Sequence, residues 1–261
     1  MTTGHLHVSS VGTELLDDPG ADPATVTRSL RNVARANRWF GGAAAARYGL
    51  GLLLRGVARG RPLTLLDLGT GAGDLPRRAV GWARRRGHLL RPLGLELSRP
   101  AAALAVRAGV PCAVACAGAP PLRERSVDIV LVSQVAHHFN RESAMHLFRT
   151  CDALARVGVV VADLRRGRLA PLAFRVGATA LGFDAVTKAD GLTSIRRGYT
   201  AGELRSLLQA AGIPARVARR PGYRLVATWR TEHSSCHPER SEGSGRGKQD
   251  PSLRGMTGLV T

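Results

Sequence analysis

The fold of this 261-residue chain follows from one stretch, Thr64-Leu65-Leu66-Asp67-Leu68-Gly69-Thr70-Gly71-Ala72-Gly73-Asp74. An apolar run, typical of a buried strand, leads directly into a Gly-x-Gly-x-Gly turn and then into the first residues of a helix. Glycines let the chain turn sharply and leave no side chain where a ligand lies against the main chain. The helix that follows offers free N–H groups to polar atoms of that ligand. The stretch therefore predicts a ligand-binding turn at the end of a strand.

The spacing of the glycines separates two kinds of ligand. A dinucleotide-binding turn has the pattern G-x-G-x-x-G. Here a single residue separates Gly71 from Gly73, and Asp67 lies two positions before Gly69. A nicotinamide-dependent oxidoreductase is therefore disfavoured, while an ordinary strand–helix turn with Asp67 on the surface stays open at this point.

A second acidic residue ends the next apolar run, PLGLEL. Glu96 lies 23 positions after Gly73 (96 − 73), close to the ~20 expected for a carboxylate that binds the hydroxyls of a ribose. An ionised carboxylate only accepts hydrogen bonds, which suits a diol. A solvated glutamate at a strand end is the alternative, and it is disfavoured because Glu96 is the only charge in this run.

Apolar runs and helical patterns alternate between residues 61 and 230. The predicted strands are LTLLDLG, PLGLEL, CAVAC, VDIVLVS, GVVVADL, Ala215–Ala218 and Tyr223–Trp229, and the predicted helices lie near 74–86, 98–108, 141–156 and 201–211. This alternation predicts an α/β fold with a mostly parallel seven-stranded sheet and helices on both faces. Thr200 and Glu203 form a capping-box pattern at the last helix, and the two strands after it predict a hairpin at the sheet edge.

The flanking regions differ from this core. Residues 1–60 predict an N-terminal helical cap, with one helix from Ala24 to Phe40 and a second through Leu54. Residues 61–230 form the main domain, and residues 168–199 are a helical insert after the fifth strand. Residues 231–261 are rich in Ser, Gly, Arg, Glu and Pro without apolar periodicity, so we predict a disordered low-complexity tail.

The formal net charge of +19 suggests a nucleic-acid partner, but its distribution argues against one. Of the 38 basic residues only Lys188 and Lys248 are lysine, the arginines are spread along the chain, and aromatic residues make up only 4%. Surfaces that bind nucleic acids usually combine clustered basic groups with stacking rings. We therefore expect no specific nucleic-acid partner, although a peripheral contact with anionic membrane headgroups remains open.

Cysteine spacing and hydropathy restrict the remaining classes. Cys112, Cys116, Cys151 and Cys236 show no convincing metal-ligand spacing, so we expect no metal and reduced thiols. The N-terminus lacks a secretory pattern. No stretch approaches the ~20 apolar residues that span a bilayer. These features predict a cytoplasmic protein and do not indicate its oligomeric state.

The stretch LLDLGTGAG resembles the first motif of class I S-adenosylmethionine-dependent methyltransferases, a family with a Rossmann-like fold. In that family the acidic residue lies near the methionine part of the cofactor, and the glycines pack against the cofactor. Residues 115–130 resemble a further motif of small-molecule methyltransferases without gaps, except that Cys116 replaces an acidic residue that holds the adenine amino group. A thiol is a poor acceptor, so adenine recognition is expected to depend on the backbone at Ala117 and Gly118. The resemblance implies S-adenosyl-L-methionine as cofactor, bound by Asp67, Gly69, Thr70, Gly71, Gly73, Glu96, Leu97, Cys116, Ala117, Gly118 and Ser133.

The segment SQVAHHF, residues 133–139, resembles the LHHF segment of methyltransferases that act on quinones, phenolics and other small molecules. It lacks the Asn/Asp-Pro-Pro-aromatic sequence typical of methyltransferases of adenine amines. A histidine with a pKa near 6.5 suits a base that takes the proton of an acceptor hydroxyl, and we prefer His138 over His137 as the side chain that faces the pocket. Helix capping or core packing is an equal alternative for either histidine, and positioning without a base also remains open.

Asp163 and Arg165 end the fifth strand at the edge where ligands bind in open α/β folds. Asp163 is a candidate base or orienting group, and Arg165 a candidate stabiliser of a phenolate; a surface ion pair is equally compatible. The catalytic candidates are therefore His137, His138 and Asp163.

The insert begins with an apolar segment, Leu169 to Phe183, which predicts a lid over the acceptor pocket, although simple coverage of the sheet is an alternative. Together with Trp39 and Phe40 it would enclose an apolar chamber. From Glu14 to Arg230 the chain resembles a bacterial group of methyltransferases often encoded beside type III polyketide synthases, which implies an alkylresorcinol, pyrone or quinone-like acceptor.

These observations predict methyl transfer from S-adenosylmethionine to the hydroxyl or ring carbon of a small aromatic, polyketide or quinone-like molecule. Two alternatives from other classes stay open. One is an RNA- or nucleic-acid-modifying methyltransferase that uses the basic surface, for which binding would depend steeply on salt. The other is a non-catalytic binding module, which the unusual Cys116 keeps in consideration.

Overall fold

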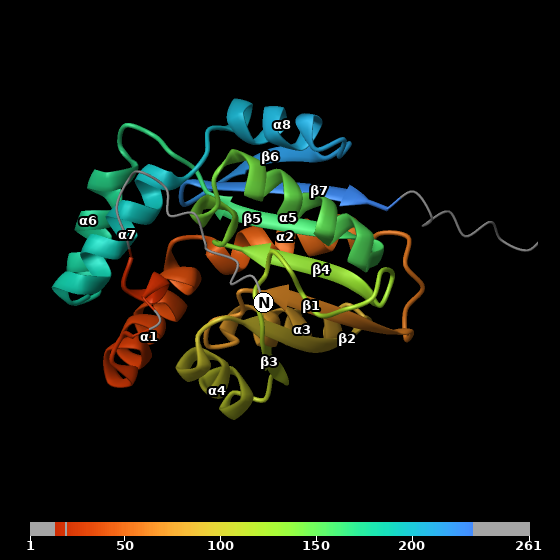
Figure 1. Cartoon of the computed structure of the whole chain (residues 1–261), viewed down its shortest axis with the longest axis horizontal. Helices are drawn as coiled ribbons and strands as arrows, with labels where there is room; N and C mark the ends of the chain where they lie inside the picture. Colours follow the sequence, from red (N-terminus) through yellow and green to blue (C-terminus); the bar gives the residue numbers. More distant parts are fainter. Residues whose placement is uncertain (1–13, 19, 232–261) are drawn as a thin grey trace, which may run out of the picture.

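The computed structural model describes residues 14–18 and 20–231. These residues form one seven-stranded sheet in the order β3-β2-β1-β4-β5-β7-β6 (Figure 1). The strands β1 to β5 are parallel, whereas β7 runs antiparallel to both β5 and β6. The strands are β1 (Pro62–Leu68), β2 (Leu89–Glu96), β3 (Cys112–Val114), β4 (Val127–Ser133), β5 (Ala155–Leu164), β6 (Arg216–Arg220) and β7 (Arg224–Arg230). The predicted α/β, Rossmann-like fold is confirmed.

The helices lie on both faces of the sheet because side chains of a strand point alternately to opposite sides. Along β1, Leu63 and Leu65 pack into a core beneath α2 and α3, while Leu66 and Leu68 pack into the opposite core beneath α5 and α8. The helices are α1 (Pro23–Trp39), α2 (Gly42–Leu54), α3 (Asp74–Arg84), α4 (Arg99–Arg107), α5 (Arg141–Leu154), α6 (Ala170–Ala180), α7 (Ala185–Arg197) and α8 (Ala201–Ala210). Two short 3₁₀ turns are η1 (Leu15–Asp17) and η2 (Ala136–His138).

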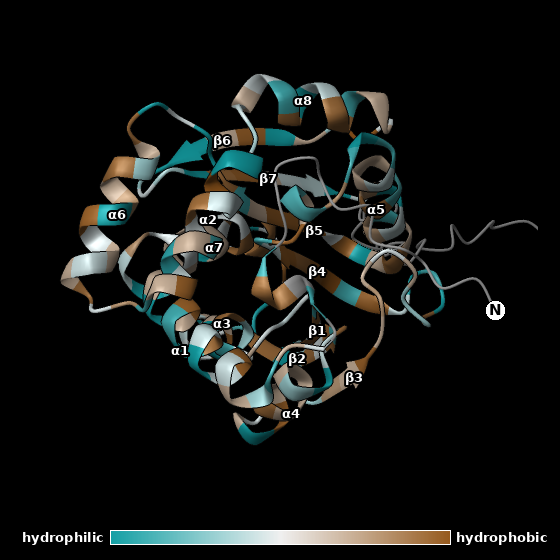
Figure 2. Cartoon of the chain, turned by 60° about the vertical axis from the view of Figure 1, so that its left-hand side comes forward, coloured by the Kyte–Doolittle hydropathy of each residue, from teal (hydrophilic) through white to brown (hydrophobic). Residues whose placement is uncertain are grey.

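The central strand β4 is covered on both faces. All seven of its residues are buried, and Figure 2 shows this strand mostly in the brown of apolar residues. A continuous apolar run of this kind is typical of a parallel strand between two helix layers. The only charge in it, Asp128, accepts a hydrogen bond from the backbone N–H of Thr64 at 2.9 Å, so the buried carboxylate has a partner.

The first N-terminal helix and the insert gather at one end of the molecule, whereas α2 packs against the sheet. Helices α1, α6 and α7 lie side by side beyond the carboxyl ends of the parallel strands, on the left of Figure 1. Asp22 begins α1 by accepting a hydrogen bond from the backbone N–H of Thr25, and Pro23 occupies the first helical position. The strand order reverses between β1 and β4 at this same end, which is where ligands bind in open α/β sheets.

The predicted C-terminal elements also form. Thr200 and Glu203 make the reciprocal capping-box contacts at the start of α8. The strands β6 and β7 form the predicted hairpin, with β6 at the edge. The third predicted strand was too long: β3 ends at Val114, so Cys116 lies in the loop after it.

Some predictions fall outside the described residues. The low-complexity tail predicted for residues 231–261 is described only at Thr231, and Cys236 and residues 1–13 are likewise not described. Among residues 14–18 and 20–231, no helix combines the length and apolar character needed to cross a bilayer.

Candidate active site

The glycine turn after β1 has the backbone that its sequence predicted. Gly69, Gly71 and Gly73 have φ angles of 70°, 54° and 73°, a region that disfavours residues with a side chain. A Cβ atom at Gly69 would collide with the side chain of Val135. The backbone N–H groups of Gly69 and Thr70 donate to the carbonyl of Leu95 at 2.8 and 3.1 Å, which ties the turn to β2. The turn therefore offers bare main chain to a cavity.

Glu96 lies beside this turn at the end of β2. Its two carboxylate oxygens accept hydrogen bonds from the backbone N–H groups of Gly71, at 2.8 Å, and Ser98, at 3.0 Å. Each oxygen keeps a further acceptor position, and the side chain lines the same cavity as the turn. The two N–H groups thus fix a carboxylate that still has room to bind a diol.

Asp67 has an unsatisfied acceptor at the cavity. The Thr70 hydroxyl donates to its Oδ2 at 2.9 Å, whereas Oδ1 has no hydrogen-bond partner among the described residues. Burial, together with the charges of Asp74 and Glu96, raises the pKa of the Asp67 carboxyl to about 8, against the opposing effect of the Thr70 hydrogen bond. A buried acceptor without a donor fits a cationic ligand group, such as the amino group of S-adenosylmethionine.

This pKa predicts a pH dependence of cofactor binding. Only the ionised Asp67 attracts a cation, and its ionised fraction rises as the pH increases through about 8. Affinity for S-adenosylmethionine should therefore rise from about pH 6.5, by at most about tenfold per pH unit, and level off near pH 8, where the α-amino group of the ligand itself loses its proton. Calorimetry over this range should show a flatter profile in Asp67→Asn, while Glu124→Gln, at an exposed position, should behave like the wild type. Parallel profiles for the wild type and Asp67→Asn would contradict this role.

The cavity at the turn brings most of the predicted cofactor residues together. Its volume is about 220 Å³. The predicted residues that line it are Asp67, Gly69, Thr70, Gly71, Glu96, Leu97, Cys116, Ala117 and Ser133. Gly73 and Gly118 do not line it: Gly73 caps α3 and packs toward Val110, and a side chain at Gly118 would meet Phe139 and Cys116. The buried Ser133 hydroxyl also has no partner among the described residues.

The three catalytic candidates do not occupy equivalent positions. Asp163 is fully buried, with Oδ1 2.6 Å from Nδ1 of His137 and Oδ2 accepting the backbone N–H of His137 at 3.1 Å. His138 lines the cavity at the glycine turn, which is called the cofactor cavity below. Asp163 and His137 line neither this cavity nor the larger one beside it. Direct action of Asp163 on an acceptor is therefore not supported, because its carboxylate is enclosed and already bound.

Burial alone raises the pKa of the Asp163 carboxyl, but the charge and the hydrogen bond of His137 lower the pKa below its ordinary value. The aspartate is thus held ionised against the imidazole. Tyr199 adds a further fixed point, since its hydroxyl donates to the carbonyl of Ala136 at 2.7 Å. These contacts hold η2 and both histidines in place at the end of β4.

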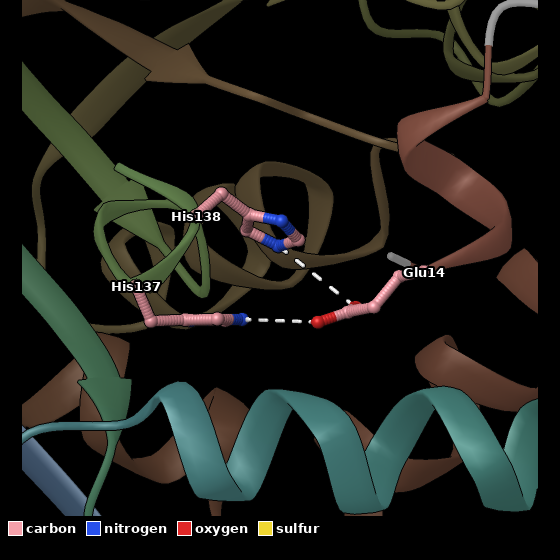
Figure 3. A group of neighbouring side chains, drawn as sticks. All are labelled: Glu14, His137 and His138. Carbon is pink, nitrogen blue, oxygen red and sulfur yellow. Dashed lines mark ion pairs between the residues drawn. The ribbon is translucent and has the colours of Figure 1, made fainter. Parts of the chain in front are cut away.

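Glu14 joins this cluster from the N-terminal segment, which the sequence did not predict. Figure 3 shows its carboxylate facing both imidazoles from one side. Oε1 lies 3.9 Å from Nε2 of His137, and Oε2 lies 4.0 Å from Nε2 of His138. The three side chains have the spacing of a metal site. However, Arg197 places its Nη1 3.1 Å from Oε1 of Glu14 and 3.2 Å from Nδ1 of His138. A guanidinium therefore already supplies the positive charge here.

A larger cavity of about 360 Å³ adjoins the first. Helices α1, α6 and α7, β5 and the β6–β7 hairpin contribute to it, and both cavities are lined by Leu16, Val33 and Gln134. Its aromatic side chains are Trp39, Phe40, Phe174, Phe183 and Tyr223. Phe40 packs edge-to-face against Phe174 and Phe183, with ring centroids 5.8 and 6.3 Å apart. The second cavity thus combines apolar walls with a connection to the glycine turn.

Gln134 lies at the junction of the two cavities and was not predicted as a site residue. Its φ of 58° is unusual for a residue with a side chain. Its amide donates to Oδ1 of Asn37 at 2.6 Å and accepts from Nη1 of Arg224 at 2.7 Å. Asn37 in turn donates to Asp74 at 3.3 Å. The sequence contained one indication of this contact: Arg224, the partner of Gln134, is a charged residue at the start of an apolar strand.

Comparison with known proteins agrees with this geometry. Residues 66–162 match the family model of a methyltransferase domain, a span that runs from β1 to β5 and includes both the glycine turn and Glu96. No curated protein matches the chain.

Solved structures show the same fold at low identity. The plantazolicin methyltransferase BpumL, in complex with a triazolic desmethylPZN analog and SAH, superposes with a TM-score of 0.62 at 13% identity, over 83% of this chain and 94% of that one. A SAM-dependent methyltransferase from Aquifex aeolicus gives 0.52 at 16%, over 79% and 97%. The O-methyltransferase NcsB1 from neocarzinostatin biosynthesis gives 0.56 at 20%, over 85% of this chain but only 62% of that one.

The fold and the matched domain define a Rossmann-like methyltransferase. Residues 66–162 form a methyltransferase domain with the class I fold, and S-adenosylmethionine is the cofactor of that class.

Proposed function

We propose that the chain methylates a small, largely apolar acceptor of the aromatic, polyketide or quinone-like kind, at a hydroxyl or a ring carbon. The observation that carries this proposal is the aromatic-lined cavity of about 360 Å³ that meets the cofactor cavity at Leu16, Val33 and Gln134. Apolar cavities with a few polar groups are typical of sites for small molecules. The similar NcsB1 structure contains 2-hydroxy-5-methyl naphthoic acid, whereas the matches described above give no support for the expected link to type III polyketide synthases.

S-adenosylmethionine supplies a methyl group on a sulfonium. In the proposed arrangement Glu96 binds the ribose, Asp67 attracts the amino group, and the glycine turn receives the nucleoside against its main chain. Cys116 and Ala117, to which the resemblance assigns adenine binding, line the same cavity. Holding the acceptor in line with the methyl group supplies much of the acceleration expected of such a site.

His138 is the candidate base because it lines the cofactor cavity and is partly exposed, with 19% of its side chain accessible. His137 and Asp163 are proposed as positioning residues, since they lie behind His138 and hold η2. The two imidazole centroids are 4.3 Å apart, so a change at His137 would displace its neighbour.

The insert of residues 168–199 is proposed as the lid of the acceptor cavity. It belongs to the proposed main domain of residues 61–230, and the proposed cap of residues 1–60 precedes that domain. Its two helices α6 and α7 pack against each other, and α7 also contacts α1 and η2. Phe174 points from α6 into the cavity, and a side chain at Gly191 of α7 would collide with its ring. The lid is thus closely packed where it covers the cavity.

Truncation of Phe174 tests the assignment of this cavity. Phe174→Ala should leave the affinity for S-adenosylhomocysteine unchanged and reduce kcat/KM for the acceptor by at least about tenfold, because a buried aromatic contact contributes more than 1 kcal/mol. Transfer of a labelled methyl group to a panel of phenols, hydroxynaphthalenes and quinols gives the measurement. Val176→Ala is the matched control, since Val176 lies on the same helix and is 64% exposed.

Two outcomes would count against the proposal. One is equal activity of Phe174→Ala and the wild type on every methylated member of the panel. The other is methylation of RNA from a cell extract with no methylation of any small molecule. Retained binding of S-adenosylhomocysteine alone, without transfer to any acceptor, would favour the non-catalytic alternative.

A further inference from the structure

Three arginines gather at one end of the acceptor cavity. Arg165 follows β5, and its backbone N–H donates to the carbonyl of Tyr223 at 2.7 Å. Arg224 begins β7 opposite Leu164 of β5, and Arg220 lies opposite Arg224 in the β6–β7 pairing. All three side chains line the cavity. The register of the three strands thus builds a cationic wall, defined here as Arg165, Arg220 and Arg224.

Within residues 14–18 and 20–231 no carboxylate forms an ion pair with this wall, and the one carboxylate that acts on it from a longer distance is Asp163, whose charge raises the pKa of Arg224 against the opposite effect of burial. The guanidinium of Arg165 lies over the Tyr223 ring at 4.9 Å, and that of Arg220 lies over the Tyr48 ring at 4.1 Å. Arg224 donates to the carbonyl of Phe40 at 3.0 Å and to Gln134, both uncharged acceptors. None of the three forms an ion pair in this part of the chain, which is unusual for arginines beside an apolar cavity.

Arg165 is the member best placed for a ligand. Its Nε is buried and has no hydrogen-bond partner among the described residues. An arginine presents donors in a planar fork that matches both oxygens of a carboxylate. Stacking on Tyr223 holds the plane of this fork.

The two acidic residues that line the same cavity are committed elsewhere. Glu14 accepts hydrogen bonds from Arg197, at 3.1 Å, and from the Ser194 hydroxyl, at 2.8 Å. The backbone N–H of Leu15 donates to both carboxylate oxygens of Asp190, each at 3.2 Å. Both belong to the side of the cavity built by α7 and the N-terminal segment. The cationic wall therefore keeps an excess of positive charge.

We infer that the methyl acceptor carries a carboxylate, bound by Arg165 within the field of Arg220 and Arg224, while its apolar ring lies against Phe40, Phe174 and Phe183. This inference rests on the proposed function and narrows it to aromatic hydroxy acids or related acidic acceptors. A carboxylate bound here offsets the cost of burying the cationic wall beside apolar side chains.

The test compares two probes that differ only in the carboxylate, 1-hydroxy-2-naphthoate and 1-naphthol. Each is titrated calorimetrically into the full chain saturated with S-adenosylhomocysteine. The wild type should bind the naphthoate at least about tenfold more tightly, because a hydrogen bond to a charged group contributes ~1.5–3 kcal/mol. The Arg165→Gln variant should bind the naphthoate about tenfold or more weakly than the wild type does, while its affinity for naphthol should stay within about twofold of the wild-type value.

Arg168→Gln is the matched control, since Arg168 lies three positions away and is exposed; it should retain the preference for the naphthoate. Thermal unfolding of each variant checks that the fold persists. The inference is overturned by equal binding of the two probes, by no binding of the naphthoate, or by a preference that survives Arg165→Gln. Methyl transfer to neutral phenols without preference for acids would overturn this inference alone, whereas absence of transfer to every small molecule would overturn the proposed function as well.

Discussion

Replacement of Glu96 by alanine is expected to weaken the binding of S-adenosylmethionine by about 100-fold. Two hydrogen bonds from the ribose hydroxyls to a charged acceptor contribute ~1.5–3 kcal/mol each, and about 3 kcal/mol in total corresponds to this factor. The same change frees the backbone N–H groups of Gly71 and Ser98, which hold the carboxylate at 2.8 and 3.0 Å. Calorimetry with S-adenosylmethionine and S-adenosylhomocysteine measures the effect on both ligands.

Two further variants make this result specific. Glu96→Gln should be intermediate, because its amide keeps one acceptor oxygen but turns an N–H₂ group toward a backbone donor. Glu124→Ala, at an exposed position outside both cavities, should bind like the wild type. Undiminished affinity in Glu96→Ala would remove Glu96 from the site and require another partner for the ribose.

The second large effect is expected when Asp163 is replaced, and it mainly lowers the free energy of unfolding. Asp163→Ala leaves the buried Nδ1 and backbone N–H of His137 without their acceptor, along with the backbone N–H of Leu164 at 2.7 Å. Breaking a buried charged pair costs ~3–5 kcal/mol, which lowers Tm by about 10 °C in a domain of this size. Thermal and denaturant unfolding give the measurement.

Asp163→Asn separates charge from hydrogen bonding. The depressed pKa of Asp163 means that its contribution to the free energy of unfolding is complete above the unfolded pKa of about 3.9 and is lost as the pH falls further. The stability difference between the wild type and Asp163→Asn should therefore shrink as the pH falls below about 4. A wild-type Tm in Asp163→Ala would show that the pair with His137 contributes nothing to the fold.

The same variant also distinguishes a positioning residue from a group that contacts the acceptor. If Asp163 acts through His137 and His138, Asp163→Asn should lower kcat and alter its pH profile while the KM of the acceptor changes little. A rise in KM with unchanged kcat would instead indicate a direct contact with the acceptor, against the complete burial of Asp163.

Predictions that depend on the local sequence around a residue agreed best with the structure. The turn at Gly69, Gly71 and Gly73 requires positive φ angles that glycine allows, so the motif specified the backbone itself. Glu96 ends a strand parallel to β1 and paired with it, which brings it to the turn. The Thr200 capping box likewise depends on contacts three residues apart.

Predictions about strand-end side chains were less accurate. Asp163 and Arg165 lie two positions apart at the same edge, and both were predicted to act on the acceptor. In the structure Arg165 lines the cavity, whereas Asp163 is sealed beneath η2. The difference arises because β5 pairs with β4 up to Ala162 and with β7 up to Leu164, whereas Arg165 lies beyond the last residue of β5.

The amino-acid sequence alone determined the sheet, the glycine turn and the acidic residue beside it, because each depends on local backbone preferences and on the alternation of apolar runs. Only the tertiary structure decided the acceptor side of the site. It brought Glu14 against His137 and His138, placed Gln134 between the cavities, and aligned Arg220 and Arg224 with β5. Those contacts join residues up to 124 positions apart (138 − 14), and their partners are set by strand register and helix packing, which no local pattern records.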